Sequence, residues 1–215
     1  MPLLLQEDLC PPGEWGVWSI TEPETELRGR LAMAPAEAEQ LSAIRGAGRR
    51  REFLAARLLL HTLSGRAERG ALVKDEFGKP HLAGSPFQVS ISHTHGFSAA
   101  IAHPRPCGVD IQTYVPRIRR LARKFVGPRE ATWLDPGDEL RQLHLLWSAK
   151  EALYKAYGRR QLDFRAHLEV DPRPAAIGEE WTRGWLRKDG QERAFRVRVV
   201  LGEEYVLVGG VEFGV

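Results

Sequence analysis

The chain has 215 residues, of which 43% are hydrophobic, so it is long enough to bury the core of one large domain or of two small ones. Its formal net charge of +3 favours acidic partners or phosphorylated ligands, but it is too small for a protein that coats nucleic acids. The two cysteines, Cys10 and Cys107, are far apart in the sequence, which excludes a CxxC zinc motif and a disulfide framework and predicts a cytoplasmic protein.

The amino-terminal residues predict neither secretion nor membrane insertion. Three leucines in MPLLLQEDLC are followed at once by Gln6, Glu7 and Asp8, and no basic region precedes them, which is not the pattern of a signal peptide. No run in the chain approaches the roughly 18 apolar residues that a membrane-spanning helix needs. We therefore expect no membrane partner.

The first half of the chain predicts a mixture of strands and helices. Strands are expected at 15–20, 71–74, 88–92 and 97–102, and helices at 36–45 and 49–63. Residues 21–35 predict a connection, and residues 75–80 a turn. Arg49, Arg50 and Arg51 begin the second helix, where the helix dipole disfavours positive charge. These arginines are interpreted either as phosphate contacts or as a solvated basic face.

Two histidines, His93 and His95, lie between the strands at 88–92 and 97–102. Their spacing would suit a metal, but no third ligand of the right type lies near them in the sequence. We expect a histidine here to donate to a phosphate group at the strand end; a plain polar turn is the alternative.

The second half predicts a strand at 107–113, helical segments at 117–124, 128–134 and 140–155, and strands at 181–186, 194–200 and 205–211. Asp110 interrupts the apolar strand at 107–113. A carboxylate in a strand core is costly unless it is paired or binds a cation. Gln112, two residues further on the same face, would be a neutral oxygen ligand.

The segment from Trp147 to Lys155 places a carboxylate and two lysines on one helix. Glu151 and Lys155 are four residues apart and lie one above the other, whereas Lys150 points about 100° away from Glu151. The chain has 25 Arg but only 6 Lys, and two of the lysines are in this segment. A compact ammonium approaches a phosphate oxygen or transfers a proton in a way that a guanidinium does not. The alternative is an ordinary surface pair worth about 0.3 to 0.5 kcal/mol.

Each half of the chain contains a long helix and several strands. We therefore predict an α+β fold of two similar α/β lobes related by pseudo-twofold symmetry, each a small antiparallel sheet packed with a long helix. The expected lobes are residues 1–105 and residues 106–215, the second of which carries the metal site and the helix with the Trp147 to Lys155 segment.

Four short motifs occur in one order: Gly78-Lys79-Pro80, Ser90-Ile91-Ser92-His93-Thr94, Gly108-Val109-Asp110, and Trp147-Ser148-Ala149-Lys150-Glu151-Ala152 followed by Lys155. Together they resemble the 4'-phosphopantetheinyl transferase superfamily, in the longer, two-lobed type that activates peptide and polyketide synthetases. The resemblance implies transfer of the 4'-phosphopantetheine arm of coenzyme A to a serine of an apo acyl or peptidyl carrier protein, with release of adenosine 3',5'-bisphosphate. It also implies a monomer without a nucleic-acid partner.

The resemblance also implies roles for individual residues. Asp110, Glu151 and, in place of a second acid, Gln112 would form the Mg2+ site, where the amide would lower the metal affinity and an added water would complete the shell. Lys155 would stabilise or protonate the leaving phosphate, and Glu130 matches an acid suggested as general base. The implied coenzyme A contacts are Lys150 and Lys155 at the diphosphate, Asp110 beside them, Ser92 and His93 at phosphates, Lys79 at the nucleotide, and Arg49, Arg50, Arg51 and Arg57 at the 3'-phosphate.

Three further interpretations stay open on the sequence alone. Residues 117–124 are either a docking face for an acidic carrier protein or a solvated basic face. The whole chain would alternatively be a basic nucleic-acid or nucleotide-binding module, with Asp110 and Glu151 in structural roles. A family member that binds coenzyme A without transferring the arm is the third interpretation, and Gln112 is the residue that argues for it.

Overall fold

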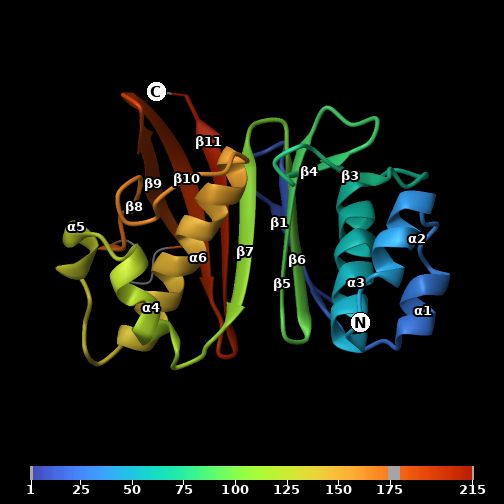
Figure 1. Cartoon of the computed structure of the whole chain (residues 1–215), viewed down its shortest axis with the longest axis horizontal. Coiled ribbons are helices and arrows are strands. Elements are labelled where there is room, and N and C mark those ends of the chain that lie inside the picture. The colour runs from blue at the N-terminus through green and yellow to red at the C-terminus, as the bar shows by residue number, and fades with distance from the viewer. Residues whose placement is uncertain (1, 174–179, 215) are drawn as a thin grey trace. The chain divides into compact units, whose positions relative to one another are not determined.

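The structure is a computed structural model that describes residues 2–173 and 180–214. The chain divides into two compact units, Met1–Pro104 and Arg105–Val215. Each unit contains one antiparallel sheet and one long helix, α3 (Ala47–Ser64) in the first and α6 (Glu139–Tyr157) in the second (Figure 1). The predicted α+β class is therefore confirmed. None of the helices in the described residues is both long and apolar enough to span a bilayer.

The first unit is built on a six-stranded sheet with the strand order β1-β2-β6-β5-β4-β3. Its strands are β1 (Leu3–Asp8), β2 (Glu14–Ser19), β3 (Leu72–Lys74), β4 (Pro80–Leu82), β5 (Gln88–Thr94) and β6 (Phe97–His103). Helix α3 packs on this sheet through a buried leucine-rich face, and α1 (Glu24–Gly29) and α2 (Pro35–Ser42) lie beside α3 (Figure 1). Gly65 ends α3 in the left-handed conformation, with φ of 58°.

The structure corrects several sequence expectations in this unit. Residues 21–35, expected as a connection, contain helix α1, in which Leu27 is fully buried and two glutamates occupy the favourable first turn. Strands β1 and β4 were not predicted; β4 has only three residues, which is too short for a periodic signal. The expected hairpin is present, but His93 belongs to β5 and pairs with Ser98, so only His95 and Gly96 remain in the turn.

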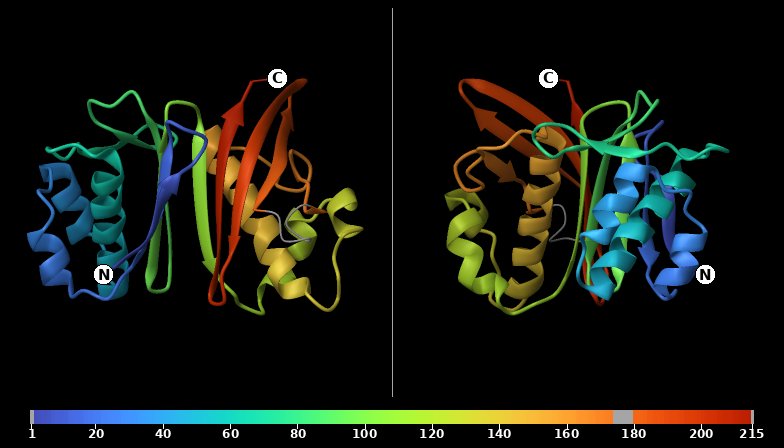
Figure 2. Two further views of the ribbon diagram at one scale, coloured as in Figure 1. Left: turned by 180° about the vertical axis from the view of Figure 1, so that it is seen from behind. Right: turned by 45° about the vertical axis from the view of Figure 1, so that its right-hand side comes forward.

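The second unit is built on a five-stranded sheet with the order β7-β11-β10-β9-β8. Its elements are β7 (Cys107–Thr113), α4 (Ile118–Phe125), α5 (Pro128–Ala131), α6, β8 (Leu168–Val170), β9 (Trp181–Lys188), β10 (Gln191–Leu201) and β11 (Tyr205–Phe213). Helix α6 lies along one face of this sheet, as both views in Figure 2 show. All elements predicted for this half are present, α5 in a shortened form, whereas the three-residue β8 was not predicted.

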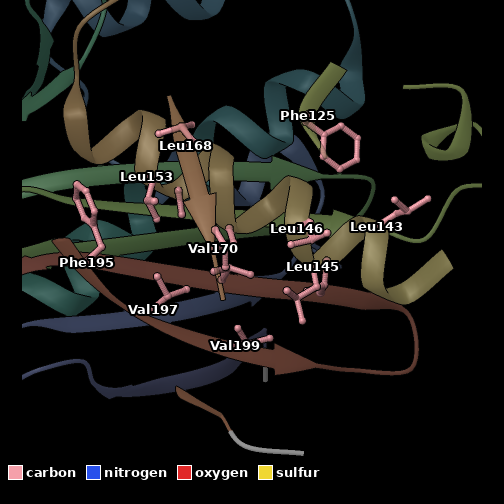
Figure 3. Close-up of a cluster of buried hydrophobic side chains, with 14 of the residues drawn as sticks. Phe125, Leu143, Leu145, Leu146, Leu153, Leu168, Val170, Phe195, Val197 and Val199 are labelled. Carbon is pink, nitrogen blue, oxygen red and sulfur yellow. The ribbon is translucent and has the colours of Figure 1, made fainter. Parts of the chain in front are cut away.

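The core of the second unit forms between α6 and the sheet. Leu146 and Leu153 from α6 and Phe195 and Val197 from β10 are fully buried, and Figure 3 shows their side chains among those of β8 and α4. The core therefore anchors α6 along its length. Because α6 carries both Glu151 and Lys155, this packing fixes where their side chains emerge.

Candidate active site

The candidate site in the second unit lies where β7 crosses α6 at very close range. A Cβ atom on Gly108 would lie 1.9 Å from the carbonyl oxygen of Ala152, so only glycine allows the two backbones to approach this closely. Two residues further along β7, Asp110 faces the same helix. Its Oδ1 accepts a hydrogen bond of 2.8 Å from Lys155 Nζ, which also donates to the carbonyl oxygen of Val109 at 2.9 Å. Asp110 is 2% exposed and the Lys155 side chain 25% exposed.

Glu151 lies on α6 one turn before Lys155 and shares its environment with Asp110. Burial and, to a smaller extent, the negative charge of Asp110 together raise the pKa of Glu151 to about 7, although the Lys155 ammonium partly opposes both effects. Two carboxylates thus share one ammonium in a largely buried place. Such excess negative charge is the environment that a hard divalent cation neutralises.

Gln112 is the third residue that the sequence assigned to the metal site. It lies two residues after Asp110 on β7, and its Nε2 donates to Asp110 Oδ2 at 3.1 Å. Among residues 2–173 and 180–214, no group of three His, Cys, Asp or Glu side chains is placed to hold a metal. Two carboxylates and one amide oxygen are thus the groups that could hold a metal here, a set that would suit Mg2+ because this ion commonly keeps several waters and takes only one or two carboxylates from the protein.

Lys150 and Glu130 form a separate, fully buried ion pair. Lys150 Nζ donates to Glu130 Oε2 at 2.7 Å and to the carbonyl oxygens of Phe125 and Phe164 at 2.5 and 3.0 Å. Neither side chain is more than 2% exposed. Glu130 also accepts hydrogen bonds from the backbone amides of Gly127 and Val170.

These contacts argue against two roles expected from the sequence: the contact of Lys150 with the diphosphate and the role of Glu130 as general base. The three protons of the Lys150 ammonium all have partners inside the protein, so contact with a diphosphate would require breaking the buried pair. Glu130 has both oxygens engaged and is shielded from solvent, which is unsuitable for a general base. The pair instead fastens α6 to the segments around α4, α5 and β8.

In the first unit, Arg49 and His93 come together at the surface. Arg49 Nη1 lies 2.5 Å from His93 Nε2, and the arginine side chain is 68% exposed. Glu52 lies beside both, with one carboxylate oxygen 3.7 Å from Arg49 and 3.6 Å from His93. Burial raises the pKa of Glu52. Glu52 was not predicted from the sequence, although its place three residues after Arg49 on the helix indicates that the two side chains meet.

Two further arginines of α3, Arg50 and Arg57, have internal partners. Arg50 donates to Glu24 at 2.8 Å and to two backbone carbonyls, and it is half-buried. Arg57 is 3% exposed and donates to Glu37 at 3.1 Å, and Arg69 pairs with the same carboxylate. Burial lowers the pKa of Arg57 to about 10. The expected contact of Arg57 with a 3'-phosphate is therefore not supported, because Arg57 belongs to a buried ion cluster.

Lys79 and Ser92 lie on separate elements of the first unit. Lys79 closes the turn before β4, and its backbone amide donates to Asp75 Oδ1 at 2.9 Å. Gly78 has φ of 88°, a conformation that favours glycine in this turn. Ser92 lies on β5 next to His93 and is 6% exposed.

The basic stretch at 117–124 contains helix α4. Ile118 and Phe125 are buried on one side of the helix, whereas Arg120, Arg123 and Lys124 are exposed. The exposed basic side chains thus form one face of a helix that is anchored by its apolar face.

Comparisons with known proteins agree on one family. The family model described as the 4'-phosphopantetheinyl transferase superfamily matches residues 106–208, and the model of the 4'-phosphopantetheinyl transferase N-terminal domain matches residues 37–103. A curated 4'-phosphopantetheinyl transferase from Bacillus subtilis is 30% identical over 136 residues, which are 61% of this chain and 58% of that protein. The match therefore spans little more than half the length of this curated relative.

Proposed function

This chain belongs to the 4'-phosphopantetheinyl transferase superfamily, and we propose that it transfers the 4'-phosphopantetheine arm of coenzyme A to a serine of an apo acyl or peptidyl carrier protein. The reaction requires Mg2+ and releases adenosine 3',5'-bisphosphate. The observation that carries the proposal is the cluster of Asp110, Glu151 and Lys155, in which two buried carboxylates and one ammonium meet where β7 crosses α6.

Asp110 and Glu151 would hold the Mg2+ ion, with the Gln112 amide oxygen bound directly or through a water. The fit rests on the donor chemistry and on the excess negative charge that raises the pKa of Glu151. When bound, Mg2+ supplies positive charge to the diphosphate that is cleaved. Because the amide of Gln112 brings no charge, the metal affinity is lower than with a third acid.

Lys155 would stabilise the leaving phosphate. Asp110 and the Val109 carbonyl hold its ammonium in place, so little reorganisation is needed when negative charge develops on the leaving oxygen. A quarter of the side chain remains exposed, in contrast to Lys150. In this proposal Lys150 and Glu130 act as positioning residues, since their buried pair holds the helix that carries Glu151 and Lys155.

The coenzyme A phosphates would be bound by the basic groups of the first unit. Arg49 donates to His93 Nε2, and its guanidinium, 68% exposed, has further N–H groups that suit the oxygens of a phosphate group. Ser92 and Lys79 are further candidates for the same cosubstrate, from the resemblance of their motifs. Arg50 would contribute through its charge, because its donors already have partners on the protein.

Intact-mass spectrometry tests the proposal. We expect an apo acyl carrier protein, an apo peptidyl carrier protein or both to gain the mass of one phosphopantetheine arm with coenzyme A and Mg2+, and not with EDTA. Lys155→Met should abolish the gain. Lys188→Met is the matched control, because the Lys188 ammonium donates to the carbonyl oxygen of Gln161 at the protein surface, and the change should leave transfer unchanged. Binding of coenzyme A without any mass gain would contradict transfer and favour a family member that only binds the cosubstrate.

A further inference from the structure

Ser148 is a fully buried polar residue on α6 whose hydroxyl is unsatisfied. Its side chain is 0% exposed, and within residues 2–173 and 180–214 its Oγ has no hydrogen-bond partner. A buried hydroxyl without a partner destabilises a protein, so natural proteins rarely keep one unless it serves another purpose. Ser148 also lies three residues before Glu151 and seven before Lys155, which places all three on one side of the helix.

Two contacts fix how β7 runs against α6. Gly108 lies against Ala152 and Ala156 near the end of the helix, and further along the chain the backbone amide of Val115 donates to His144 Nε2, near the start of the helix, at 3.1 Å. The strand and the helix therefore run in opposite directions. Position 148, one turn after His144 and one turn before Ala152, lies opposite the part of the chain between Asp110 and Val115.

Gln112 is the polar residue of this part of β7 that faces the helix. Alternation along the strand puts it on the same face as Gly108 and Asp110, both of which contact α6. Its amide nitrogen donates to Asp110 Oδ2, and Lys155 already occupies Oδ1. Both oxygens of the Asp110 carboxylate are thus engaged with donors. A cation that binds Asp110 through Oδ2 displaces the Gln112 amide, whose N–H group then needs another acceptor.

We propose that Ser148 Oγ is this acceptor, and that Ser148 is a positioning residue for the cation. When Mg2+ binds, the Gln112 amide group turns, its nitrogen donates to Ser148 Oγ, and its oxygen faces the metal or a water on the metal. The Ser148 hydroxyl proton can be given to the carbonyl oxygen one helical turn back, as serine in helices commonly does. This proposal rests on the Mg2+ requirement of the proposed function. In this arrangement Ser148 holds the neutral amide of Gln112 so that the amide oxygen faces the cation.

The replacement Ser148→Ala separates this role from a purely structural one. Without Mg2+, the variant should unfold at the same temperature as the wild type or higher, because it loses an unsatisfied hydroxyl and no hydrogen bond. Its Mg2+ affinity, measured by titration calorimetry with Mg2+ alone and with saturating coenzyme A, should fall about 10-fold, as for other residues that orient a metal ligand. A packing role alone predicts the reverse: a lower unfolding temperature and an unchanged affinity.

A double-mutant cycle with Gln112→Ala shows whether Ser148 acts through the amide. In the Gln112→Ala background, Ser148→Ala should not lower the Mg2+ affinity further, because the group that Ser148 orients is gone. The proposal is overturned if Ser148→Ala binds Mg2+ as tightly as the wild type, or if its effect persists undiminished without Gln112. If the wild type binds no Mg2+ in either condition, the proposed metal requirement fails first, and the role of Ser148 fails with it.

Discussion

At the scale of single residues, Lys150 and Lys155 differ in burial although only five positions on one helix separate them. The Lys150 ammonium is 0% exposed and donates to one carboxylate and two carbonyl oxygens. The Lys155 ammonium bonds to Asp110 at the edge of the core and remains partly exposed. The Lys150 ammonium is therefore a fixed internal charge, whereas a phosphate group can contact the partly exposed Lys155 side chain.

We therefore expect Lys150→Met to destabilise the protein by about 3 to 5 kcal/mol, because Glu130 would keep a buried charge without its partner. Urea denaturation measures this free energy of unfolding. Adding Glu130→Gln to Lys150→Met should recover part of the loss by removing that charge. Lys188→Met is the control, with a change of less than about 0.5 kcal/mol. A stable Lys150→Met protein with tenfold weaker coenzyme A binding would instead support the phosphate contact that burial argues against.

The raised pKa of Glu151 makes the stability of the metal-free protein depend on pH. Between the ordinary value of 4.5 and the native value of about 7, the native state holds a proton that the unfolded chain has released. The free energy of unfolding therefore falls as pH rises through this window and is level with respect to this group above it. Glu151→Gln removes this fall, so at pH 8 without Mg2+ the variant should be more stable than the wild type by about 1 to 3 kcal/mol.

Urea denaturation in EDTA at pH 5 and at pH 8 measures this difference. The gain from Glu151→Gln should be largest at pH 8 and small at pH 5, where Glu151 is mostly protonated in the native state. Equal gains at both pH values would show that burial and Asp110 do not raise this pKa.

The sequence predicted which residues carry charge in this region but not which charges are buried. Asp110 was predicted to need a partner or a cation because it interrupts an apolar strand. Glu151 and Lys155 were predicted to lie one above the other because they are four residues apart on a helix. The burial of Arg57 and Lys150 depends on Glu37 and Glu130, each twenty residues earlier in the chain. No local sequence pattern indicates an ion pair between residues that are so far apart. Arg57 and Lys150 were therefore expected to contact phosphates of coenzyme A instead.

At the scale of elements, the contact between β7 and α6 decides where the site residues lie. Glycine at 108 lets the strand backbone rest against the helix, and Asp110 consequently reaches Lys155. The bounds of β7 agree with the predicted strand at 107–113, because an apolar run with a single acid is a strong signal. The close approach itself was not predicted, since a glycine in a strand has several explanations that only the packing separates.

Gly108→Ala should disrupt this contact. The added Cβ would lie 1.9 Å from the Ala152 carbonyl oxygen and 2.8 Å from the Ala156 nitrogen, and because both are backbone atoms the elements must move apart. We expect a loss of stability of about 2 kcal/mol or more, together with weaker Mg2+ binding. Gly210 pairs with Gly108 across the sheet, yet a Cβ there meets its nearest atom, on Leu153, at 3.4 Å. Gly210→Ala is therefore the matched control, and equal losses in the two variants would contradict the account.

At the scale of the whole molecule, the two units repeat one plan: an antiparallel sheet, one long helix and a buried ion cluster. The buried ion cluster consists of Glu37, Arg57 and Arg69 in the first unit, and of Glu130 and Lys150 in the second. The sequence predicted the sheets and long helices from periodicity, and the pseudo-twofold relation between the lobes stays a prediction. The buried clusters were not predicted, because charged residues in a sequence are read as exposed by default.

The mild positive charge of the chain also bears on its protein partner. We expect the double replacement of Arg120 and Arg123 by Glu to raise KM for an acidic carrier protein about tenfold and leave KM for coenzyme A unchanged, because these exposed side chains lie on one face of α4. Steady-state kinetics at low and high salt measure this effect, and the difference between the proteins should shrink at high salt. An unchanged KM for the carrier would indicate that this face is merely solvated.

We propose that the cluster of Asp110, Glu151 and Lys155 performs phosphopantetheine transfer. Following both products of a single reaction tests this role: the mass of the carrier protein and the released adenosine 3',5'-bisphosphate. We expect the two to form in equal amounts, a carrier with its acceptor serine changed to alanine to gain no mass, and Asp110→Asn to lose both products together. Release of the nucleotide without any gain by the carrier, or transfer that persists in Asp110→Asn, would rule out this role of the cluster.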